Sequence, residues 1–354
     1  MSKTWFVIML VLLTANNVRT FIQCNGVISF DLGRTSLPQT FNSDCFGSKY
    51  SLRGGNCIHD WVWAERQFMD ANVSISSSEI RKLPSTQELL ALLGETPLFL
   101  DGKENGDDQC SKFQGHVSEE KRWIGVAGLF NTGTNLLYTL LYDNCEMPGN
   151  NNDDRVHWQV PWGKHEFANI SRSRTALQHN STDKDDGLAV VVIKDPYDWI
   201  HSMCRNPYLV KWNNVTNHCP DLSSTVTAWK THKNIMQFWN EWYEMYINHD
   251  YFPYPKVMIK FEDLVIRPKE TISKICSCAG GSLRVPFKYV VTSAKNGAGH
   301  NSKTGMFEAW SQFHWPKEAM AGLSSEDFKI AKESLDDNLM ALFKYLHPPD
   351  IERV

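Results

Sequence analysis

The sequence lacks several features that would place it in a common class of protein. It has no long run of lysine or arginine, and its formal net charge of −4 gives no electrostatic basis for binding nucleic acid. It shows no internal repeat, and no set of cysteines and histidines has the spacing of a zinc site. Hydrophobic residues make up 42% of the chain, which excludes wholesale disorder and allows a large folded core.

Long apolar segments are also scarce. The run from Trp5 to Ala15 is preceded by Lys3 and is much shorter than the roughly 20 residues that span a bilayer. It is typical of the central region of a secretory signal, so we expect residues 1–20 to be a signal peptide or a short signal-anchor. Such an anchor would be the protein's only contact with a membrane.

Glycosylation signals and cysteine usage agree with a lumenal location. The sequons for N-glycosylation lie at Asn72, Asn169, Asn180 and Asn214. Nine cysteines are many for a cytosolic enzyme but ordinary where disulfides persist, and their odd number leaves at least one thiol free or paired between chains. For Cys276 and Cys278, separate bridges, or one bridge and one free buried thiol, are favoured over a metal site.

The most informative segment runs from Trp123 to Leu137. An apolar stretch, a small polar turn and an amphipathic pattern follow one another, which predicts a strand, a loop and a helix. Gly133 lets the backbone approach an anion, Thr132 and Thr134 supply hydroxyls, and the first N–H groups of the helix point to the same position. This nest suits a phosphate or sulfate, although an ordinary strand-to-helix turn is the alternative. The spacing G-x-x-x-x-G-K-[ST] of a nucleoside triphosphate loop is absent.

A second segment, Leu188 to Ser202, brings a cation and a hydroxyl to the end of a strand. Its continuous β-branched run predicts a fully buried parallel strand that ends at Lys194. Asp195 and Pro196 are typical of the cap and first turn of a helix. Ser202 lies two helical turns further on, so the lysine and the serine can converge on one anion.

Together these segments resemble the sulfotransferase superfamily, whose sulfuryl donor is 3′-phosphoadenosine 5′-phosphosulfate. In that family a K/R-[ST]-G-T-[TN] loop cradles the 5′-phosphosulfate, and an R-D-P-x-[DE]-x-x-x-S segment clamps the 3′-phosphate. The resemblance assigns the 5′-phosphosulfate to Thr132, Gly133, Thr134 and Asn135. It assigns the 3′-phosphate to Lys194 and Ser202, and it places Asn131 where the family has its first Lys or Arg.

Two further blocks match in the same order. Residues 256–275 resemble the family's strand-Y-E-D-L-x-x-x-P-helix block. Residues 323–346 resemble its closing helix, with a capping-box-like start at Ser324 and an apolar face formed by Leu335, Leu339, Leu342 and Phe343. The resemblance covers residues 122–346 and implies an α/β fold, a parallel β-sheet flanked by helices in a P-loop NTPase-like three-layer sandwich. Residues 24–121 match no block and are expected to form a cysteine-bearing N-terminal extension of unknown role.

The general base is expected between the two phosphate-binding segments. Lys164-His165 stands where many family members carry a K-x-H segment, so His165 is the candidate base and His157 the alternative. Asn131 departs from the family pattern, because its amide donates a hydrogen bond but brings no charge. Either Lys164 supplies the missing cation, or catalysis is weaker, or the chain binds the donor without turnover.

Other segments give expectations about local structure. Residues 85–94 predict a short capped helix, and 224–248 predict a long helix with an aromatic stripe that is packed in the core. Residues 102–115 are polar and acidic and are expected to be a linker. The glycine-rich loop after residue 294 resembles the family's late loop over the 3′-phosphate and adenine, which makes Lys295 and Gly297 candidates.

We therefore expect a sulfotransferase of the secretory pathway, in the Golgi lumen or secreted. It would transfer a sulfuryl group to a hydroxyl of a carbohydrate or glycoconjugate, without a metal, because protein donors can neutralise the phosphate leaving group. The main alternative is a catalytically weak or inactive sulfotransferase-like protein that binds the nucleotide or a glycan. A nucleoside kinase on the same scaffold is disfavoured by the absent loop lysine.

Overall fold

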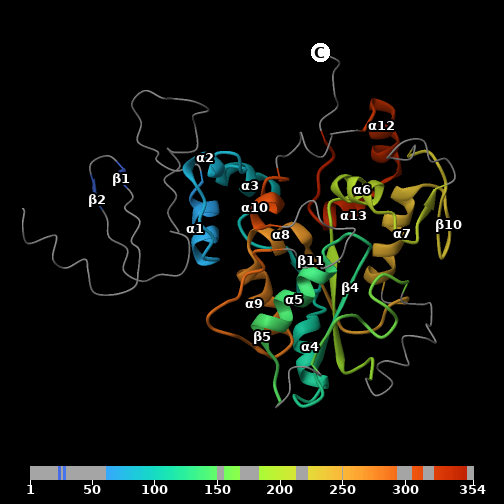
Figure 1. Ribbon diagram of the computed structural model, residues 1–354. Coiled ribbons are helices and arrows are strands. Elements are labelled where there is room, and N and C mark those ends of the chain that lie inside the picture. The colour runs from blue at the N-terminus through green and yellow to red at the C-terminus, as the bar shows by residue number, and fades with distance from the viewer. Residues whose placement is uncertain are drawn as a thin grey trace, which may run out of the picture. The chain divides into compact units, whose positions relative to one another are not determined.

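The computed structural model describes residues 61–149, 155–167, 183–212, 222–248, 250–292, 305–313 and 323–348, and two short strands before them (Figure 1). These strands, β1 (Gln23–Cys24) and β2 (Val27–Ile28), pair in antiparallel fashion. They belong to a first unit, residues 1–60, and the rest of the chain forms a second unit from Trp61 onward. The predicted signal segment 1–20 lies outside the described residues, and none of the described helices is long and apolar enough to cross a bilayer.

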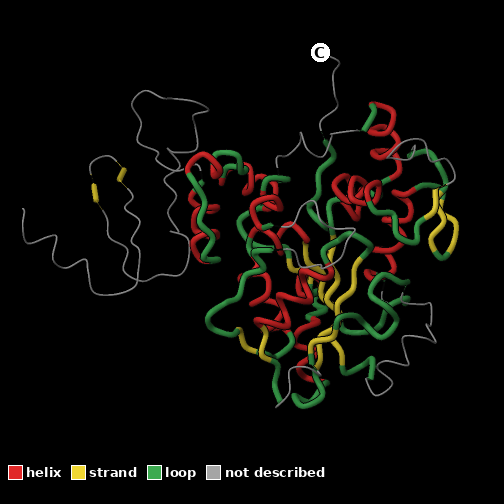
Figure 2. Tube along the Cα trace, in the orientation of Figure 1, coloured by secondary structure: helices red, strands yellow, loops and turns green. Residues whose placement is uncertain are grey.

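A five-stranded, mainly parallel sheet forms the centre of the second unit (Figure 2). Its parallel strands are β4 (Trp123–Gly128), β6 (Val156–His157), β7 (Gly187–Ile193) and β11 (Lys256–Lys260). The edge strand β3 (Phe99–Leu100) is antiparallel to β11, and the order is β3-β11-β7-β4-β6. The predicted α/β class with a parallel sheet flanked by helices is confirmed.

The apolar sequence of β7 accounts for its central place. Every residue of β7 is buried, and the strand pairs in parallel with β4 on one side and β11 on the other. Ala189 and Val191 enter the core on one face, whereas Leu188 and Val190 enter the core on the opposite face. A strand that is covered on both faces reads as a continuous apolar run and not as an alternation of apolar and polar residues. The predicted buried parallel strand is therefore confirmed.

Helices cover both faces of the sheet, as Figure 1 shows. On one face lie α4 (Gln109–His116), α5 (Thr134–Asn144) and α9 (Pro268–Cys278). On the other lie α6 (Pro196–Arg205), α7 (Ile235–Ile247), α12 (Ser325–Ser334) and α13 (Asp337–Leu342). A third core contains α1 (Val62–Asp70), α2 (Ser77–Ile80), α3 (Thr86–Leu93), α10 (Met306–Trp310) and the end of α8 (Phe261–Ile266).

Small sheets and a 3₁₀ turn complete the described unit. β5 (Cys145–Glu146) pairs with β12 (Ser282–Leu283) beside α5 and α9. β8 (Lys211–Trp212), β9 (Val226–Ala228) and β10 (Lys230–His232) form a three-stranded antiparallel sheet. The 3₁₀ turn η2 (Lys103–Asn105) precedes α4.

Residues 61–121 are part of the same compact unit as the sheet. They supply β3 to that sheet and α4 to one of its helical layers. The compact unit begins at Trp61, so residues 61–121 belong to it. The predicted linker at 102–115 is wrong, because η2 lies in its first half and α4 fills its second half. Asp108 caps α4 by accepting the N–H of Ser111, at 2.9 Å.

Disulfides fix these helices to one another. Cys110 of α4 is bonded to Cys278, and Cys145 is bonded to Cys276, so the two cysteines of α9 form separate bridges as one of the alternatives predicted. Cys204 is disulfide-bonded as well. Such bonds indicate an oxidising environment of the secretory type.

The long helix predicted at 224–248 is shorter in the structure. Residues 226–232 form the β9–β10 hairpin, because Val226, Ala228 and His232 are buried on its inner side. α7 starts only after Asn234, whose side chain accepts the N–H of Gln237 at 2.9 Å.

The structure divides the predicted closing helix into two helices. The capping box at Ser324 is confirmed, but α12 ends at Ser334, and Asp336 starts α13 by accepting the N–H of Leu339. As a result Leu342 is 38% exposed, whereas the other members of the predicted apolar face are buried. The capped helix predicted at 85–94 is confirmed as α3, with Ser85 as its N-cap.

A buried ion pair joins α8 to the end of α3. Asp263 accepts the N–H of Leu98 and the Nε–H of Arg267, each at 2.8 Å, and both charged side chains are almost fully buried. Arg267 also donates to the carbonyls of Leu93 and Gly94, at 3.0 and 3.1 Å. The pair thus holds the end of α3 and the segment after it against the junction of α8 and α9.

We expect Asp263→Asn to lower the free energy of unfolding by about 3–5 kcal/mol, because it leaves the buried Arg267 uncompensated. Glu270→Gln is the matched control: Glu270 and Lys274 form another i,i+4 pair in the following helix, but it is exposed, with N···O at 4.0 Å. Its loss should change stability by less than about 0.5 kcal/mol. Urea denaturation with disulfides intact measures both, and equal effects would contradict this interpretation.

Candidate functional site

The candidate site lies where the sheet reverses its order. From β4 the chain passes through α5 to β6, and then returns to β7 on the other side of β4. The helices that follow the two neighbouring strands, α5 and α6, cover opposite faces of the sheet. In open α/β sheets, ligands bind outside the carboxyl ends of the strands at such a reversal. Residues 129–133 follow β4 at this edge, and Lys194 follows β7.

Gly133 shapes the loop between β4 and α5. Its φ is 83°, and a Cβ atom there would lie 2.4 Å from the ring of Phe261. It is the N-cap of α5, so the first N–H groups of this helix are not capped by a side chain. Thr132 and Thr134 are buried, and Thr132 donates its hydroxyl hydrogen to the carbonyl of Leu129 at 2.7 Å. The predicted strand, loop and helix are confirmed.

Asn131 ties this loop to α6. Its side-chain amide donates to the carbonyls of Ser202 and Asn206, at 3.1 and 2.8 Å. Its φ is 61°, a left-handed conformation that asparagine tolerates better than most residues. Both amide hydrogens thus have backbone acceptors at the end of α6.

The structure brings Lys194 and Ser202 together, as the eight-residue separation predicted. The Lys194 ammonium donates to Ser202 Oγ at 2.9 Å, and both side chains are buried. Ser202 in turn donates to the carbonyl of Asp198 at 3.2 Å. The ammonium also lies 4.9 Å from the ring centre of Phe261, the ring that packs against Gly133. Phe261 therefore joins the ends of β4, β7 and β11, a role that the sequence did not reveal.

Lys164 reaches the first turn of α5 from the segment that follows β6. Its ammonium donates to Asn135 Oδ1 at 2.8 Å and lies 3.5 Å above the ring of Trp158. The Trp158 indole N–H contacts the same oxygen at 3.3 Å. Although Lys164 is only 6% exposed, its charge is thus placed at the N-terminus of a helix that Gly133 leaves open.

His165, from the segment after β6, lies against Gly128 at the end of β4. Its Nδ1 is 2.7 Å from the carbonyl oxygen of Gly128, which can only accept, so the neutral ring carries its hydrogen on Nδ1. Nε2 is then the nitrogen that can take up a proton. The main chain of this segment is fixed as well, because the Gly128 N–H donates to the carbonyl of Lys164 at 2.8 Å.

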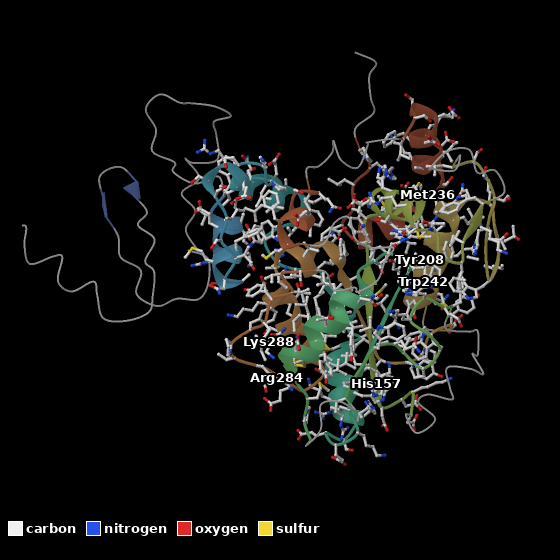
Figure 3. The ribbon with its side chains drawn as sticks, viewed as in Figure 1. His157, Tyr208, Met236, Trp242, Arg284 and Lys288 are labelled. Atoms are coloured by element: carbon white, nitrogen blue, oxygen red, sulfur yellow. A yellow bond between two sulfur atoms is a disulfide. The ribbon has the colours of Figure 1, made fainter. Side chains whose placement is uncertain are left out.

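The aromatic residues of α6 and α7 hold the loops of the site in place. The stripe is packed in the core as predicted, and its polar atoms also donate to main-chain carbonyls at the carboxyl edge of the sheet. These bonds join Trp199 to Phe130 (2.7 Å), Trp242 to His165 (3.1 Å), Trp239 to Lys194 (3.2 Å) and Tyr243 to Val192 (3.0 Å). Figure 3 labels Trp242 in this half of the unit.

Burial controls the charge of the acids beside Lys194. Burial, together with the carboxylates of Asp198 and Glu262, raises the pKa of Asp195 to about 8. Burial also raises the pKa of Glu262, against the opposing effect of Lys260. Burial therefore disfavours the charged form of both carboxyl groups.

The other predicted residues lie elsewhere. His157 stacks on the ring of Trp123 at 4.7 Å and pairs with Gly125, before the end of β4; Figure 3 draws it well apart from Tyr208. Asn72, an N-glycosylation candidate, is exposed in the turn after α1. Lys295, Gly297, Asn169, Asn180 and Asn214 lie outside the described residues.

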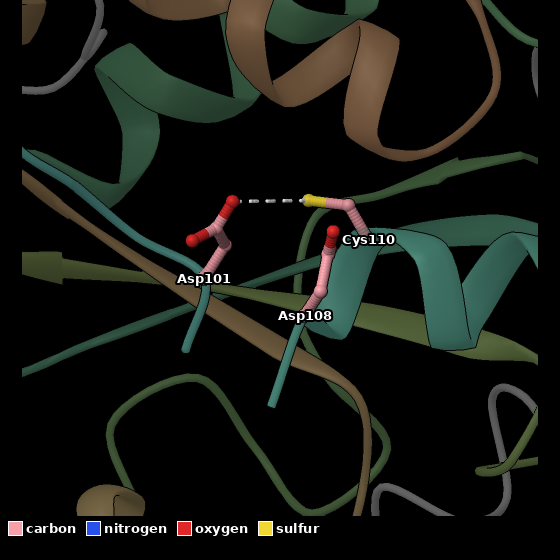
Figure 4. A group of neighbouring side chains, drawn as sticks. All are labelled: Asp101, Asp108 and Cys110. Atoms are coloured by element: carbon pink, nitrogen blue, oxygen red, sulfur yellow. Dashed lines mark hydrogen bonds between the residues drawn. The ribbon is translucent and has the colours of Figure 1, made fainter. Parts of the chain in front are cut away.

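Figure 4 shows a group that resembles a metal-ligand set, Asp101, Asp108 and Cys110. The sulfur of Cys110 lies 3.9 Å from a carboxylate oxygen of Asp101. That sulfur is bonded to Cys278, so it has no hydrogen to donate and cannot serve as a thiolate ligand. Asp108 is already used as the cap of α4. The group is best explained as part of the local structure.

No known protein-family model matches this chain, and no curated protein matches its sequence.

We expect Gly133→Ala to destabilise the protein by more than about 2 kcal/mol, because the new methyl group adds a clash with Phe261 to a left-handed backbone. Gly106→Ala separates the two effects, since Gly106 has a φ of 75° and no atom within 4 Å of an added Cβ. It should cost only about 1–2 kcal/mol. Thermal unfolding measures both variants; a smaller loss at Gly133 than at Gly106 would refute the close packing against Phe261.

Proposed function

We propose that the protein is a sulfotransferase that transfers a sulfuryl group from 3′-phosphoadenosine 5′-phosphosulfate to a hydroxyl of a carbohydrate or glycoconjugate in the Golgi lumen. The observation that carries the proposal is the meeting of two predicted anion-binding segments at Phe261. This ring packs against Gly133 of the first segment and lies 4.9 Å from the Lys194 ammonium of the second. The proposal includes the P-loop NTPase-like form of the α/β fold, which the order of these segments favours.

Each side chain has a role in this proposal. The open N-terminus of α5 binds the 5′-phosphosulfate, and Lys194 with Ser202 binds the 3′-phosphate. His165 Nε2 takes the proton of the acceptor hydroxyl as the new S–O bond forms. The S–O bond to the bridging oxygen breaks, and the charge that develops on the leaving phosphate is stabilised by Lys164 and the N–H groups of α5.

Lys164 also bears on Asn131, the position at which the sequence departs from the family pattern. The amide of Asn131 is bonded to carbonyls of α6, so its contribution is to hold the loop. Lys164 brings a full charge to Asn135 in the first turn of α5. This placement favours an active enzyme over the alternative, a sulfotransferase-like protein that binds nucleotide without turnover.

The direct test is incubation of the purified protein with donor carrying ³⁵S-sulfate and a panel of glycans. Transfer of label to a glycan supports the proposal. If no label is transferred, calorimetry with adenosine 3′,5′-bisphosphate distinguishes two explanations. Nucleotide binding without transfer, even at high protein concentration, supports the inactive binding protein. Absence of both nucleotide binding and transfer overturns the proposal.

The 3′-phosphate assignment predicts the behaviour of two variants. Lys194→Ala should weaken binding of adenosine 3′,5′-bisphosphate by about 1.5–3 kcal/mol, roughly 10–150-fold, because it removes a charged hydrogen bond. Ser202→Ala should cost about 1 kcal/mol. Adenosine 5′-monophosphate, which lacks the 3′-phosphate, is the control ligand, and its affinity should not change. Calorimetry that finds parent-like binding in Lys194→Ala would refute the assignment.

The base assignment predicts the opposite pattern. His165→Ala should leave donor binding nearly intact and lower kcat by about 10²–10⁴-fold, the usual contribution of a general base. Lys164→Ala should also lower kcat, since it removes the cation beside the leaving group. Steady-state assays measure both, and a His165→Ala variant with parent-like kcat would exclude this residue as the base.

A further inference from the structure

Three aromatic rings gather beside His165. The Phe130 ring stacks on Tyr208, with centres 5.4 Å apart and planes at 13°, and on Trp229, at 5.5 Å and 2°. The ring of His165 lies 4.6 Å from the same phenylalanine. We call Phe130, Tyr208 and Trp229 the aromatic platform. It connects three loops, after β4, after α6 and between β9 and β10, to the candidate base.

Backbone strain is concentrated at this platform. Tyr208 and Trp229 have φ angles of 53° and 59°, a left-handed region that bulky side chains rarely adopt. Asn131, next to Phe130, has a φ of 61°. Strained conformations of this kind are retained where the surrounding structure imposes them, and they gather at functional sites. Here they orient two large rings toward one phenylalanine.

One side of the platform is held by a hydrogen bond, and the other side is partly exposed. The Trp229 indole N–H donates at 3.0 Å to Glu166, a buried residue adjacent to His165. In contrast, Tyr208 is 45% exposed and the next residue, Leu209, is 60% exposed. A free phenol or a lipid is normally enclosed on most of its surface. A sugar ring, in contrast, is apolar on its faces and polar at its rim. It can bind by contact with a single aromatic face while its hydroxyl groups stay in water.

We propose that the aromatic platform binds a pyranose ring of the acceptor and that Tyr208 is the residue on which it stacks, an inference that rests on the proposed function. The C–H groups on one face of a sugar pack against the π face of an aromatic ring. The sugar's hydroxyls stay at its rim, and the one to be sulfated is directed to His165. Tyr208 is labelled in Figure 3.

The test measures sugar binding directly, so that it does not depend on transfer. The probes are N-acetyllactosamine, an unsulfated chondroitin hexasaccharide and 4-nitrophenol, titrated into the full-length protein with and without adenosine 3′,5′-bisphosphate. We expect a sugar to bind more tightly than 4-nitrophenol. Tyr208→Ala should weaken sugar binding by roughly 5–20-fold, whereas Tyr208→Phe should stay within about 2-fold of the parent, because the ring and not the hydroxyl makes the contact.

The matched control is Tyr251→Ala, which removes a tyrosine that is 60% exposed just before β11, at the opposite edge of the sheet. It should leave sugar binding unchanged. Binding of 4-nitrophenol alone, no sugar binding, or parent-like affinity in Tyr208→Ala would each overturn the proposal. Failure of the proposed function has a different signature: adenosine 3′,5′-bisphosphate does not bind to the parent, while sugar binding still depends on Tyr208.

Discussion

The parallel register between β4 and β7 is the constraint on which the site depends. It runs from Trp123 opposite Gly187 to Gly128 opposite Val192, so both strands end at the same edge of the sheet. α5 and α6 leave these ends toward opposite faces, which is the arrangement at which open α/β sheets bind ligands. A shift of one residue in this register would turn every side chain of β7 to the other core and would move Lys194 away from the loop of Gly133.

The same edge is fixed by side chains that are not among the predicted site residues. Phe261 packs against Gly133 and lies near Lys194, so that the end of β11 supports the ends of β4 and β7. The indole and phenol groups of α6 and α7 donate to carbonyls along this edge, which fixes the direction of those carbonyls. A core of aromatic residues thus also determines which backbone groups face the site.

Local patterns predicted the parts of this structure that depend on neighbouring residues. The apolar run of β7, the caps at Ser85 and Ser324, and the approach of Lys194 to Ser202 follow from spacing and backbone preference. Contacts between distant segments were not predictable in this way. Phe261 and Trp158 meet their partners only through the sheet, the β9–β10 hairpin overrides helical spacing because its inner side is buried, and α4 is attached through a disulfide to a helix far along the chain.

We propose that one nucleotide spans the loop after β4 and the segment from Lys194 to Ser202. A crystal structure of the protein with adenosine 3′,5′-bisphosphate tests it most directly. We expect the 5′-phosphate at the N–H groups of Gly133 and Thr134, and the 3′-phosphate within hydrogen-bond distance of Lys194 Nζ and Ser202 Oγ. A nucleotide bound elsewhere, or bound in this place with its 3′-phosphate directed away from Lys194, would contradict it.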